Sequence, residues 1–233
     1  MRFLLVQSSY WGVKHTMSKP YRLVVFDWEG TLGEDGFSIL LSIMSQVSQR
    51  MLLGSLDLSA ARRYINAGLV TTIKQVFPEA TLYQQEELLY AIQKEVTESS
   101  TTVRLMAGAW EVLQWLNTQN VHLAIATNKS HQGLMHALAQ TGLDVIFKVT
   151  RTASQAPPKP CPQMLEEIID VFGVDASQTL MIGDSTNDML MAAAIGVDAL
   201  GVDFFHQEAA DLREAGALHV VDDYQQLLQY LKE

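Results

Sequence analysis

The sequence predicts an α/β protein of the Rossmann-like type, in which helices sandwich a parallel sheet and a small helical cap domain is inserted after the first strand. Three observations support this prediction. Apolar runs typical of buried strands alternate with helical patterns through the second half of the chain, and this order indicates βαβ units. A long helical block separates the first two strands. The length of 233 residues, with 48% hydrophobic and 18% charged residues, allows one such domain and a modest insertion.

The first strand is predicted over 22–26, because these residues form a continuous apolar run that ends at Asp27 and is followed by glycines. From about 37 to 99, apolar residues recur at spacings of three and four residues, which is the helical period. Three helices fit this segment, with turns near 54–59 and at Pro78.

Strands and helices are then expected to alternate. The predicted elements are helix 108–118, strand 121–126, helix 130–140, strand 145–149, helix 162–172, strand 179–182, helix 187–194, strand 199–202, a short helix, strand 219–221 and a last helix. The predicted domains are an N-terminal extension over 1–16, an α/β core over 17–34 and 101–233, and the helical cap over 35–100. Ligands of such sheets bind at the carboxyl ends of the strands, so the residues after each strand are the candidates for chemistry.

Composition restricts the partners. The formal net charge of −10, from 26 acidic and 16 basic residues, argues against nucleic acid and against an anionic membrane, because clustered Lys and Arg hold both. No segment approaches the roughly 20 apolar residues of a membrane span, and the single cysteine, Cys161, is typical of a reducing compartment. We therefore expect a cytoplasmic protein. The sequence leaves its oligomeric state open.

Polar side chains follow several of the predicted strands. They are Asp27, Glu29 and Gly30 after the first strand, Thr127 and Asn128 after the second, Lys159 in the loop before a helix, and Asp184 and Asp188 after strand 179–182. Taken singly, each residue has an ordinary alternative as a turn residue, a helix cap or a solvated lysine. Their joint occurrence at one edge of one sheet favours a functional site.

These residues make a coherent chemical set. Two converging carboxylates, Asp27 and Asp184, would repel unless a cation lay between them, and Mg²⁺ prefers such oxygen ligands together with substrate phosphate. The other phosphate oxygens would be held by the Lys159 ammonium, the Thr127 hydroxyl, Asn128 and backbone N–H groups near Gly30. Asp27 could then attack phosphorus as a nucleophile, so the expected partner is a small phosphorylated metabolite.

The same residues resemble the motifs of the haloacid dehalogenase superfamily of phosphatases: Asp-x-Asp-Gly-Thr/Val, a strand-end Ser or Thr, a Lys, and Gly-Asp-x-x-x-Asp. The resemblance covers nearly all of the chain from Tyr21. The segments Thr127-Asn128-Lys129, Lys159-Pro160 and 182–189 are most similar to the phosphoglycolate phosphatase branch, and 65–69 is similar to a turn in its cap. The resemblance implies catalytic roles for Asp27, Glu29 and Lys159, phosphate binding by Gly30, Thr127, Asn128 and Lys159, and a magnesium site of Asp27, Glu29, Asp184 and Asp188.

One residue departs from the family pattern. Where the family has a second Asp, two residues after the nucleophile, this chain has Glu29. The resemblance implies that this residue protonates the leaving group and then activates water, and that its backbone carbonyl helps to hold the metal. A general acid is worth about 10²- to 10⁴-fold, and misplacement by about 1 Å can cost about 10²-fold. The expected protein is therefore a working but slow phosphatase.

Other functions fit the same residues. Glu29 also suits a catalytically weakened protein that binds a phosphorylated ligand, and the family includes phosphosugar mutases. A dehalogenase is the least favoured, because that chemistry needs neither the metal site at Asp184 nor an acid at position 29.

The predicted cap would close over the site on hinges near 33–36 and 100–102. Arg62, Arg63 and Asn66 are candidates to meet a second anionic group of the substrate. The alternative for the two arginines, a pair of exposed residues on a helix surface, has at least even weight.

Overall fold

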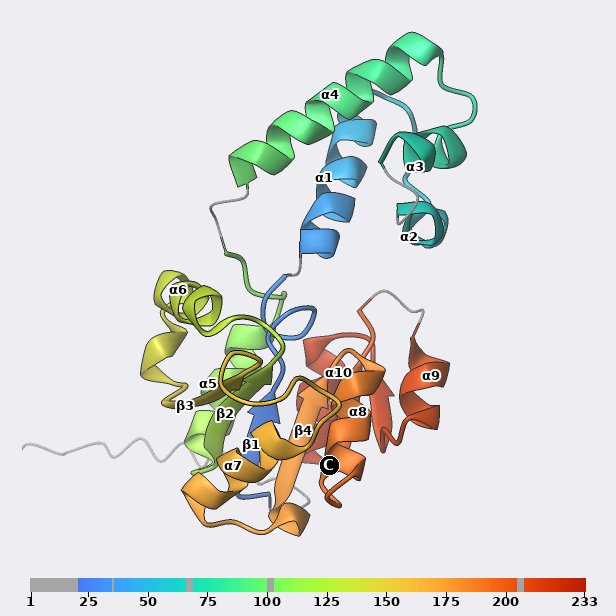
Figure 1. Cartoon of the computed structure of the whole chain (residues 1–233). Coiled ribbons are helices and arrows are strands. Elements are labelled where there is room, and N and C mark those ends of the chain that lie inside the picture. The colour runs from blue at the N-terminus through green and yellow to red at the C-terminus, as the bar shows by residue number, and fades with distance from the viewer. Residues whose placement is uncertain (1–20, 35, 66–68, 100–102, 205–207) are drawn as a thin grey trace, which may run out of the picture.

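The computed structural model describes residues 21–34, 36–65, 69–99, 103–204 and 208–233 (Figure 1). The predicted extension over 1–16 and the predicted hinge at 100–102 lie outside these residues. None of the described helices combines the length and the apolar character needed to cross a bilayer.

In the described part of the chain, six parallel strands form one sheet in the order β3-β2-β1-β4-β5-β6. The strands are β1 (Leu23–Phe26), β2 (His122–Thr127), β3 (Val149–Thr152), β4 (Thr179–Gly183), β5 (Asp198–Val202) and β6 (His219–Val221). The chain runs outward from β1 first to one side and then, from β4, to the other. The order of the strands therefore reverses next to β1, which is where open parallel sheets bind their ligands.

Alternate residues of β1 explain why helices cover both faces of the sheet. Val24 and Phe26 pack with α5 (Ala109–Thr118), α6 (His131–Thr141) and α10 (Tyr224–Lys232). Leu23 and Val25 pack with α7 (Gln163–Phe172), α8 (Thr186–Ala193) and α9 (Ala209–Glu214). A strand buried on both faces needs apolar side chains at every position, which accounts for the uninterrupted apolar run and confirms the predicted three-layer α/β fold.

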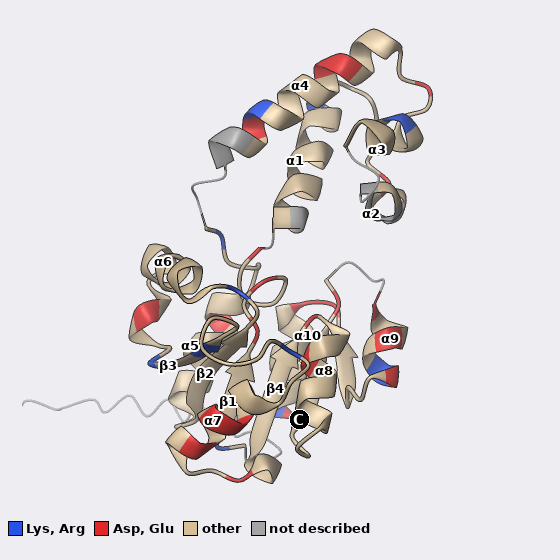
Figure 2. Ribbon diagram, viewed as in Figure 1, with Lys and Arg blue, Asp and Glu red and all other residues tan. Residues whose placement is uncertain are grey.

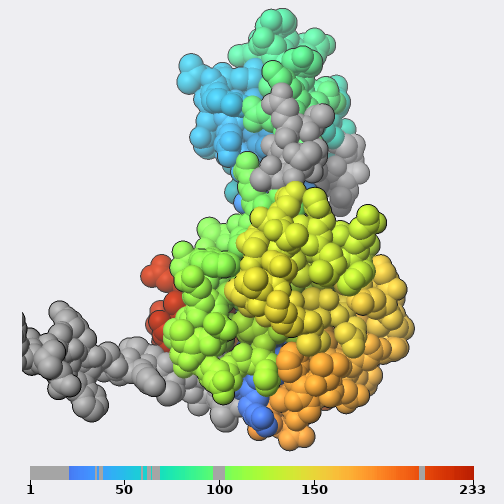
Figure 3. Space-filling view, turned by 90° about the vertical axis from the view of Figure 1, so that its left-hand side faces the viewer, coloured from blue at the N-terminus to red at the C-terminus, as the bar shows by residue number. Residues whose placement is uncertain are grey.

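Helices follow β1 before the sheet resumes, as predicted. They are α1 (Gly36–Arg50), α2 (Leu58–Ile65), α3 (Leu69–Val76) and α4 (Leu82–Ser99), and we call them the helical insertion. Its buried residues form a cluster of their own, centred on Met44, Ile73, Leu88 and Ile92. Figure 1 shows the insertion standing beyond the carboxyl ends of the strands, and Figure 3 shows it as a lobe that projects from the core.

The prediction of three helices in this segment was wrong, since the described residues form four. The segment near 54–59, predicted as a turn, contains the start of α2. The side chain of Asp57 accepts a hydrogen bond from the backbone N–H of Ala60 at 3.0 Å. A side-chain oxygen in this place satisfies a free N–H group of the first helical turn, so α2 begins at the end of the predicted turn. The additional helix arises because the segment between the two predicted turns, expected as one helix, forms both α2 and α3.

The prediction of a strand over 145–149 was also wrong. The residues Leu143–Val145 form a 3₁₀ turn, in which Val145 is 67% exposed, and the strand β3 runs over Val149–Thr152. Phe147 instead fills the core, where its ring meets that of Phe26 edge-on at 6.1 Å. Because β3 is the edge strand, it tolerates polar residues that hide it from a search for apolar runs. The other predicted core elements begin and end within one residue of the observed ones.

The two linkers that join the insertion to the core are paired with each other. The backbone N–H of Glu34 donates to the carbonyl of Arg104, and that of Met106 donates to the carbonyl of Leu32, both at 2.9 Å. The chain therefore leaves and re-enters the core at one place.

Candidate active site

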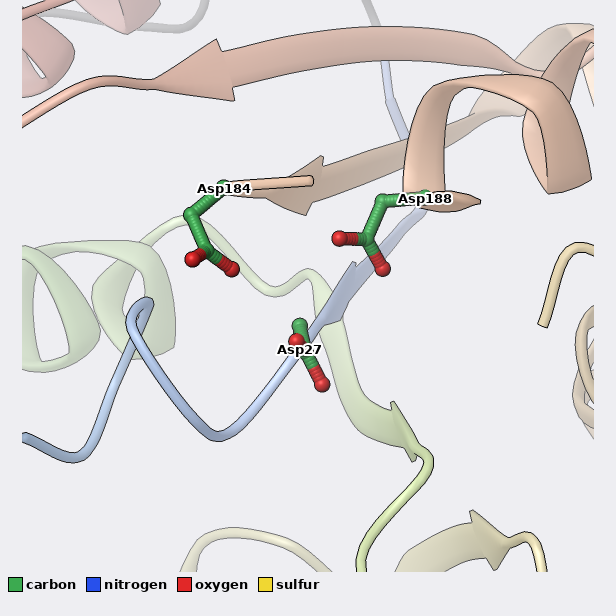
Figure 4. A group of neighbouring side chains, drawn as sticks. All are labelled: Asp27, Asp184 and Asp188. Carbon is green, nitrogen blue, oxygen red and sulfur yellow. The ribbon is translucent and has the colours of Figure 1, made fainter. Parts of the chain in front are cut away.

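Three aspartates meet at the carboxyl ends of the central strands. Asp27 follows β1, Asp184 follows β4, and Asp188 lies in the first turn of α8. Figure 4 shows the three side chains turned toward one another, and one oxygen of each lies within 4.8 Å of the others. The sequence prediction that Asp27, Asp184 and Asp188 come together is thus confirmed in their placement.

The loop after β1 brings its backbone close to Asp184. The backbone N–H of Gly30 donates to the carbonyl of Gly33 at 2.9 Å, and that of Gly33 donates to the carbonyl of Trp28 at 2.7 Å. Gly30 has a φ of +75°, and a Cβ atom there would lie 2.1 Å from Oδ2 of Asp184. Only glycine satisfies both the left-handed backbone and the close approach, so Gly30 shapes the site. Its N–H, which was predicted to bind phosphate, is already donated to Gly33.

Asp188 makes bonds with both carboxylate oxygens. Its Oδ2 accepts from the backbone N–H of Ser185 at 3.1 Å and from the Ser185 hydroxyl at 2.7 Å. Its Oδ1 accepts from Nζ of Lys159 at 2.6 Å. Asp188 therefore caps the start of α8 and also contacts Lys159, while its role in the chemistry stays a prediction. Both of its oxygens already have protein partners, so it is a less available metal ligand than Asp27 or Asp184.

Lys159 lies buried between two of the aspartates. Its Nζ is 2.7 Å from Oδ1 of Asp27 and 2.6 Å from Oδ1 of Asp188. Burial alone would lower the pKa of this ammonium, but the carboxylates of Asp27 and Asp188 outweigh burial and raise it. The Asn128 side chain accepts from the backbone N–H of Lys159 at 2.9 Å, so Asn128 holds the lysine loop in place.

The negative charges of the buried cluster are only partly balanced by the positive charge of Lys159. Burial, followed by the charges of Asp27 and Asp188, raises the pKa of Asp184 from 3.8 to about 8. Burial also raises the pKa of Asp27, to about 6, although Lys159 opposes this shift. Three carboxylates face one ammonium, and all of their donor atoms are hard oxygens. Such a set fits Mg²⁺, which is commonly held by one or two carboxylates with substrate phosphate.

Three hydroxyl groups complete the surroundings. Thr127, at the end of β2, is buried, and its hydroxyl oxygen accepts from the backbone N–H of Lys129 at 3.2 Å. The Thr31 hydroxyl donates to Oδ1 of Asp184 at 3.2 Å, and the carbonyl of Thr31 accepts from the hydroxyl of Tyr224 at 2.8 Å. Sequence reasoning missed Thr31 and Tyr224. Thr31 stands in the quoted motif and could have been found, whereas nothing near Tyr224 signals a contact across 193 positions.

Glu29 lies apart from the buried cluster. Its side chain is 49% exposed, and its Oε1 is 2.7 Å from Nζ of Lys129. The carboxylate therefore lies at the solvent side of the strand ends. Its partner, Lys129, was not among the predicted site residues.

The candidates in the helical insertion are only partly described. Arg62 and Arg63 belong to α2, but their side chains lie outside the described structure, as does the whole of Asn66. Their contact with a substrate stays a prediction.

Comparison with known proteins agrees with these observations. Residues 24–202 match the family model of haloacid dehalogenase-like hydrolases. A phosphoglycolate phosphatase of Pseudomonas fluorescens is 28% identical over 214 residues, which cover 89% of this chain and 78% of the relative. A phosphoglycolate phosphatase of Haemophilus influenzae is 27% identical over 225 residues, which cover 92% of this chain and all of the relative.

Solved structures show the same fold. The crystal structure of a predicted phosphoglycolate phosphatase from Haemophilus somnus superposes with a TM-score of 0.61 at 21% identity, covering 91% of this chain and 98% of the other. A HAD family hydrolase from Deinococcus radiodurans gives a TM-score of 0.64 at 23% identity, covering 90% and 94%.

Proposed function

The chain belongs to the haloacid dehalogenase-like hydrolases, and from this premise we propose that it is a magnesium-dependent phosphatase that hydrolyses a small organic phosphate monoester. Phosphoglycolate is the favoured substrate, because the relatives from Pseudomonas fluorescens and Haemophilus influenzae are phosphoglycolate phosphatases. The observation that carries the proposal is the buried cluster itself, in which Asp27 lies beside both a fixed ammonium, Lys159, and a second carboxylate, Asp184.

In the first step, an oxygen of Asp27 attacks phosphorus, and the bond from phosphorus to the ester oxygen breaks. Lys159, at 2.7 Å from Asp27, keeps this carboxylate ionised and offers its charge to the phosphoryl oxygens. Glu29 gives its proton to the departing oxygen. The product of this step is an aspartyl-phosphate on Asp27 and a free alcohol.

In the second step, Glu29, now ionised, accepts a proton from water as the water oxygen attacks phosphorus. The bond to Asp27 breaks, and inorganic phosphate leaves. Asp27 and Asp184, with the backbone carbonyl of Glu29, would hold Mg²⁺, which when bound neutralises phosphoryl charge. Asp188, whose oxygens bind Lys159 and Ser185, acts chiefly by fixing the ammonium.

We place the helical insertion over this site as a cap. Its helices follow directly on the loop that carries Asp27 and Glu29, and they stand beyond the strand ends (Figure 1). Arg62, Arg63 and Asn66 remain the candidates for a second anionic group of the substrate.

One observation favours a second candidate function, a protein that binds a phosphorylated ligand with little turnover. The Glu29 carboxylate is half exposed and paired with Lys129, away from the buried aspartates. Robust turnover by the unmodified chain would exclude this alternative, and retention of the phosphoryl group on a product sugar would instead indicate a mutase.

The proposal is tested by measuring free phosphate released from phosphoglycolate and from an aryl phosphate, with Mg²⁺ and with a chelator. We expect release only with Mg²⁺, and a fall of at least about 10³-fold in the Asp27→Asn variant, because the nucleophile is lost. Asp170→Asn, an exposed change on α7, is the matched control and should behave as the parent. Undiminished hydrolysis by Asp27→Asn would refute the aspartyl nucleophile.

A further inference from the structure

We propose that Lys129 is a positioning residue for Glu29, one that fixes the longer acid this chain carries; the inference rests on the proposed function. Nζ of Lys129 lies 2.7 Å from Oε1 of Glu29. Among the hydrogen bonds and ion pairs of the described residues, this is the one that the Glu29 carboxylate makes.

The lysine is held from two sides before it reaches Glu29. Its backbone N–H donates to the Thr127 hydroxyl oxygen at 3.2 Å, at the end of the strand next to β1. Its aliphatic stem lies over Gly133 in the first turn of α6, where a Cβ atom would come within 3.3 Å of the lysine Cε. Ser130 fixes that turn by accepting from the Gly133 N–H at 3.2 Å. The ammonium is thus directed from a fixed backbone along a surface shaped by glycine.

Glu29 needs such a partner because of its length. A glutamate side chain has one more rotatable bond than an aspartate, so fixing it in one conformation costs more conformational entropy. Its side chain is 49% exposed, so surrounding atoms do little to restrict it. A charged partner at 2.7 Å restricts the carboxylate to the region within reach of the Lys129 ammonium.

The pair contributes little to the stability of the fold. The two side chains are 26% and 49% exposed, and exposed ion pairs add little to the stability of a protein because solvent screens them. A purely structural role would therefore leave turnover unchanged. A role in phosphate binding would change the KM whichever acid stood at position 29, whereas a positioning role depends on Glu29.

The test is a double-mutant cycle on the full chain with Mg²⁺ and the best substrate of a phosphate-ester panel. Lys129→Met should lower kcat by between about 5-fold, the most an exposed ion pair is worth, and about 100-fold, the effect of misplacing a group by about 1 Å, with KM within about twofold of the parent. Lys129→Arg should restore most of kcat. In a Glu29→Asp background, Lys129→Met should change kcat by less than about twofold. Lys148→Met, an exposed lysine on another loop, is the control for loss of charge.

Three results would overturn the inference: an unchanged or higher kcat in Lys129→Met, an equal loss in both backgrounds, or a loss confined to KM. These differ from failure of the proposed function itself. In that case the unmodified chain releases phosphate from no member of the panel, and the role of Lys129 is refuted with it.

Discussion

Single residues of this site serve the fold and the chemistry together. Gly30 closes the loop after β1 through its N–H bond to Gly33, and it is also the residue that lets Asp184 approach that loop. Asp188 begins α8 through Ser185 and holds Lys159 through its other oxygen. Such double use means that substitutions near the cluster should affect activity and local structure at once, and it makes matched controls essential.

Gly30→Ala should disable the site. Its added Cβ would lie 2.1 Å from Oδ2 of Asp184 at a φ of +75°, so either the loop or the metal ligand must move. We expect kcat/KM to fall at least about 100-fold, as for a misplacement of about 1 Å, and Mg²⁺ binding measured by calorimetry to weaken.

Gly142→Ala distinguishes the effect of backbone strain at a positive φ from the effect of the close approach to Asp184. Gly142 has a similar φ of +70°, but no atom lies within 4 Å of its would-be Cβ. This variant should lose about 1 kcal/mol of stability from backbone strain and keep its activity. Equal losses of activity in both variants would argue against the close approach to Asp184 as the cause.

The residues that the sequence predicted correctly share a simple property. Asp27, Thr127 and Asp184 stand at the ends of strands that could be located from apolar runs, so their convergence followed from topology. The pairing of Glu29 with Lys129 could not be predicted, because it depends on how two loops approach each other. The same holds for the bond from Tyr224 to Thr31.

At the scale of elements, α10 shows how a distant helix supports the site. Tyr224 begins this helix, is almost fully buried, and stacks on Phe204 with ring centroids 5.4 Å apart. Its hydroxyl holds the carbonyl of Thr31, whose side chain donates to Asp184. Burial and the charges of Asp184 and Asp27 raise the pKa of the Tyr224 hydroxyl, so it stays a donor.

Tyr224→Phe should weaken this support without removing a group that touches substrate. The buried carbonyl of Thr31 would lose its donor, which costs about 1–3 kcal/mol, and Asp184 would be held less firmly. We expect a lower urea midpoint and weaker Mg²⁺ affinity by calorimetry. Tyr90→Phe, at an exposed position of α4, should change neither. If Tyr224→Phe retained the stability and affinity of the parent, α10 would have no supporting role.

Helices and strands could be predicted where a pattern of apolar residues within the segment itself determines the structure. The buried strands β1, β2 and β4 follow from uninterrupted apolar runs, and most core helices follow from their period. The strand β3 was predicted too early in the sequence, because this edge strand carries Thr and Arg residues that interrupt the apolar pattern. In the insertion, the turns near 54–59 and at Pro78 were predictable from their residues, whereas periodicity did not separate α2 from α3.

At the scale of the whole molecule, most acidic residues of the second half of the chain lie on the surface, and only a few belong to the candidate site. Residues 151–233 contain 14 acidic and 4 basic residues, many of them on α7 and α9 (Figure 2). The acidity of the chain is therefore mostly a property of the surface of one half of the core. The buried aspartates are few, but their raised pKa values lead us to expect that they set how the stability of the fold responds to pH.

The metal-free protein should lose stability as pH rises from about 4 to about 8. The folded-state pKa values of Asp27 and Asp184 are raised from 3.8 to about 6 and about 8, so the folded state binds more protons than the unfolded state in this range. The free energy of unfolding then falls with pH. Urea denaturation in the presence of a chelator at pH 5 and pH 8 measures the difference.

Two further measurements identify the source of that pH dependence. Asp184→Asn should flatten the profile, because it removes the carboxyl with the larger shift, whereas the exposed change Asp175→Asn should not. Mg²⁺ should raise the midpoint more at pH 8 than at pH 5, since protons compete with the metal for the carboxylates. A profile that is flat in the parent would contradict the proposed electrostatics of the cluster.

The paired linkers at Leu32, Glu34, Arg104 and Met106 make the protein modular. Because the backbone crosses out of the core and back at hydrogen-bonding distance, a short turn could bridge the same gap in place of the insertion. The buried clusters on the two faces of the sheet draw on the described core residues alone. The helical insertion could thus be replaced without opening these buried clusters, and under the proposed cap role such a replacement would change substrate preference while leaving the aspartates at the strand ends in place.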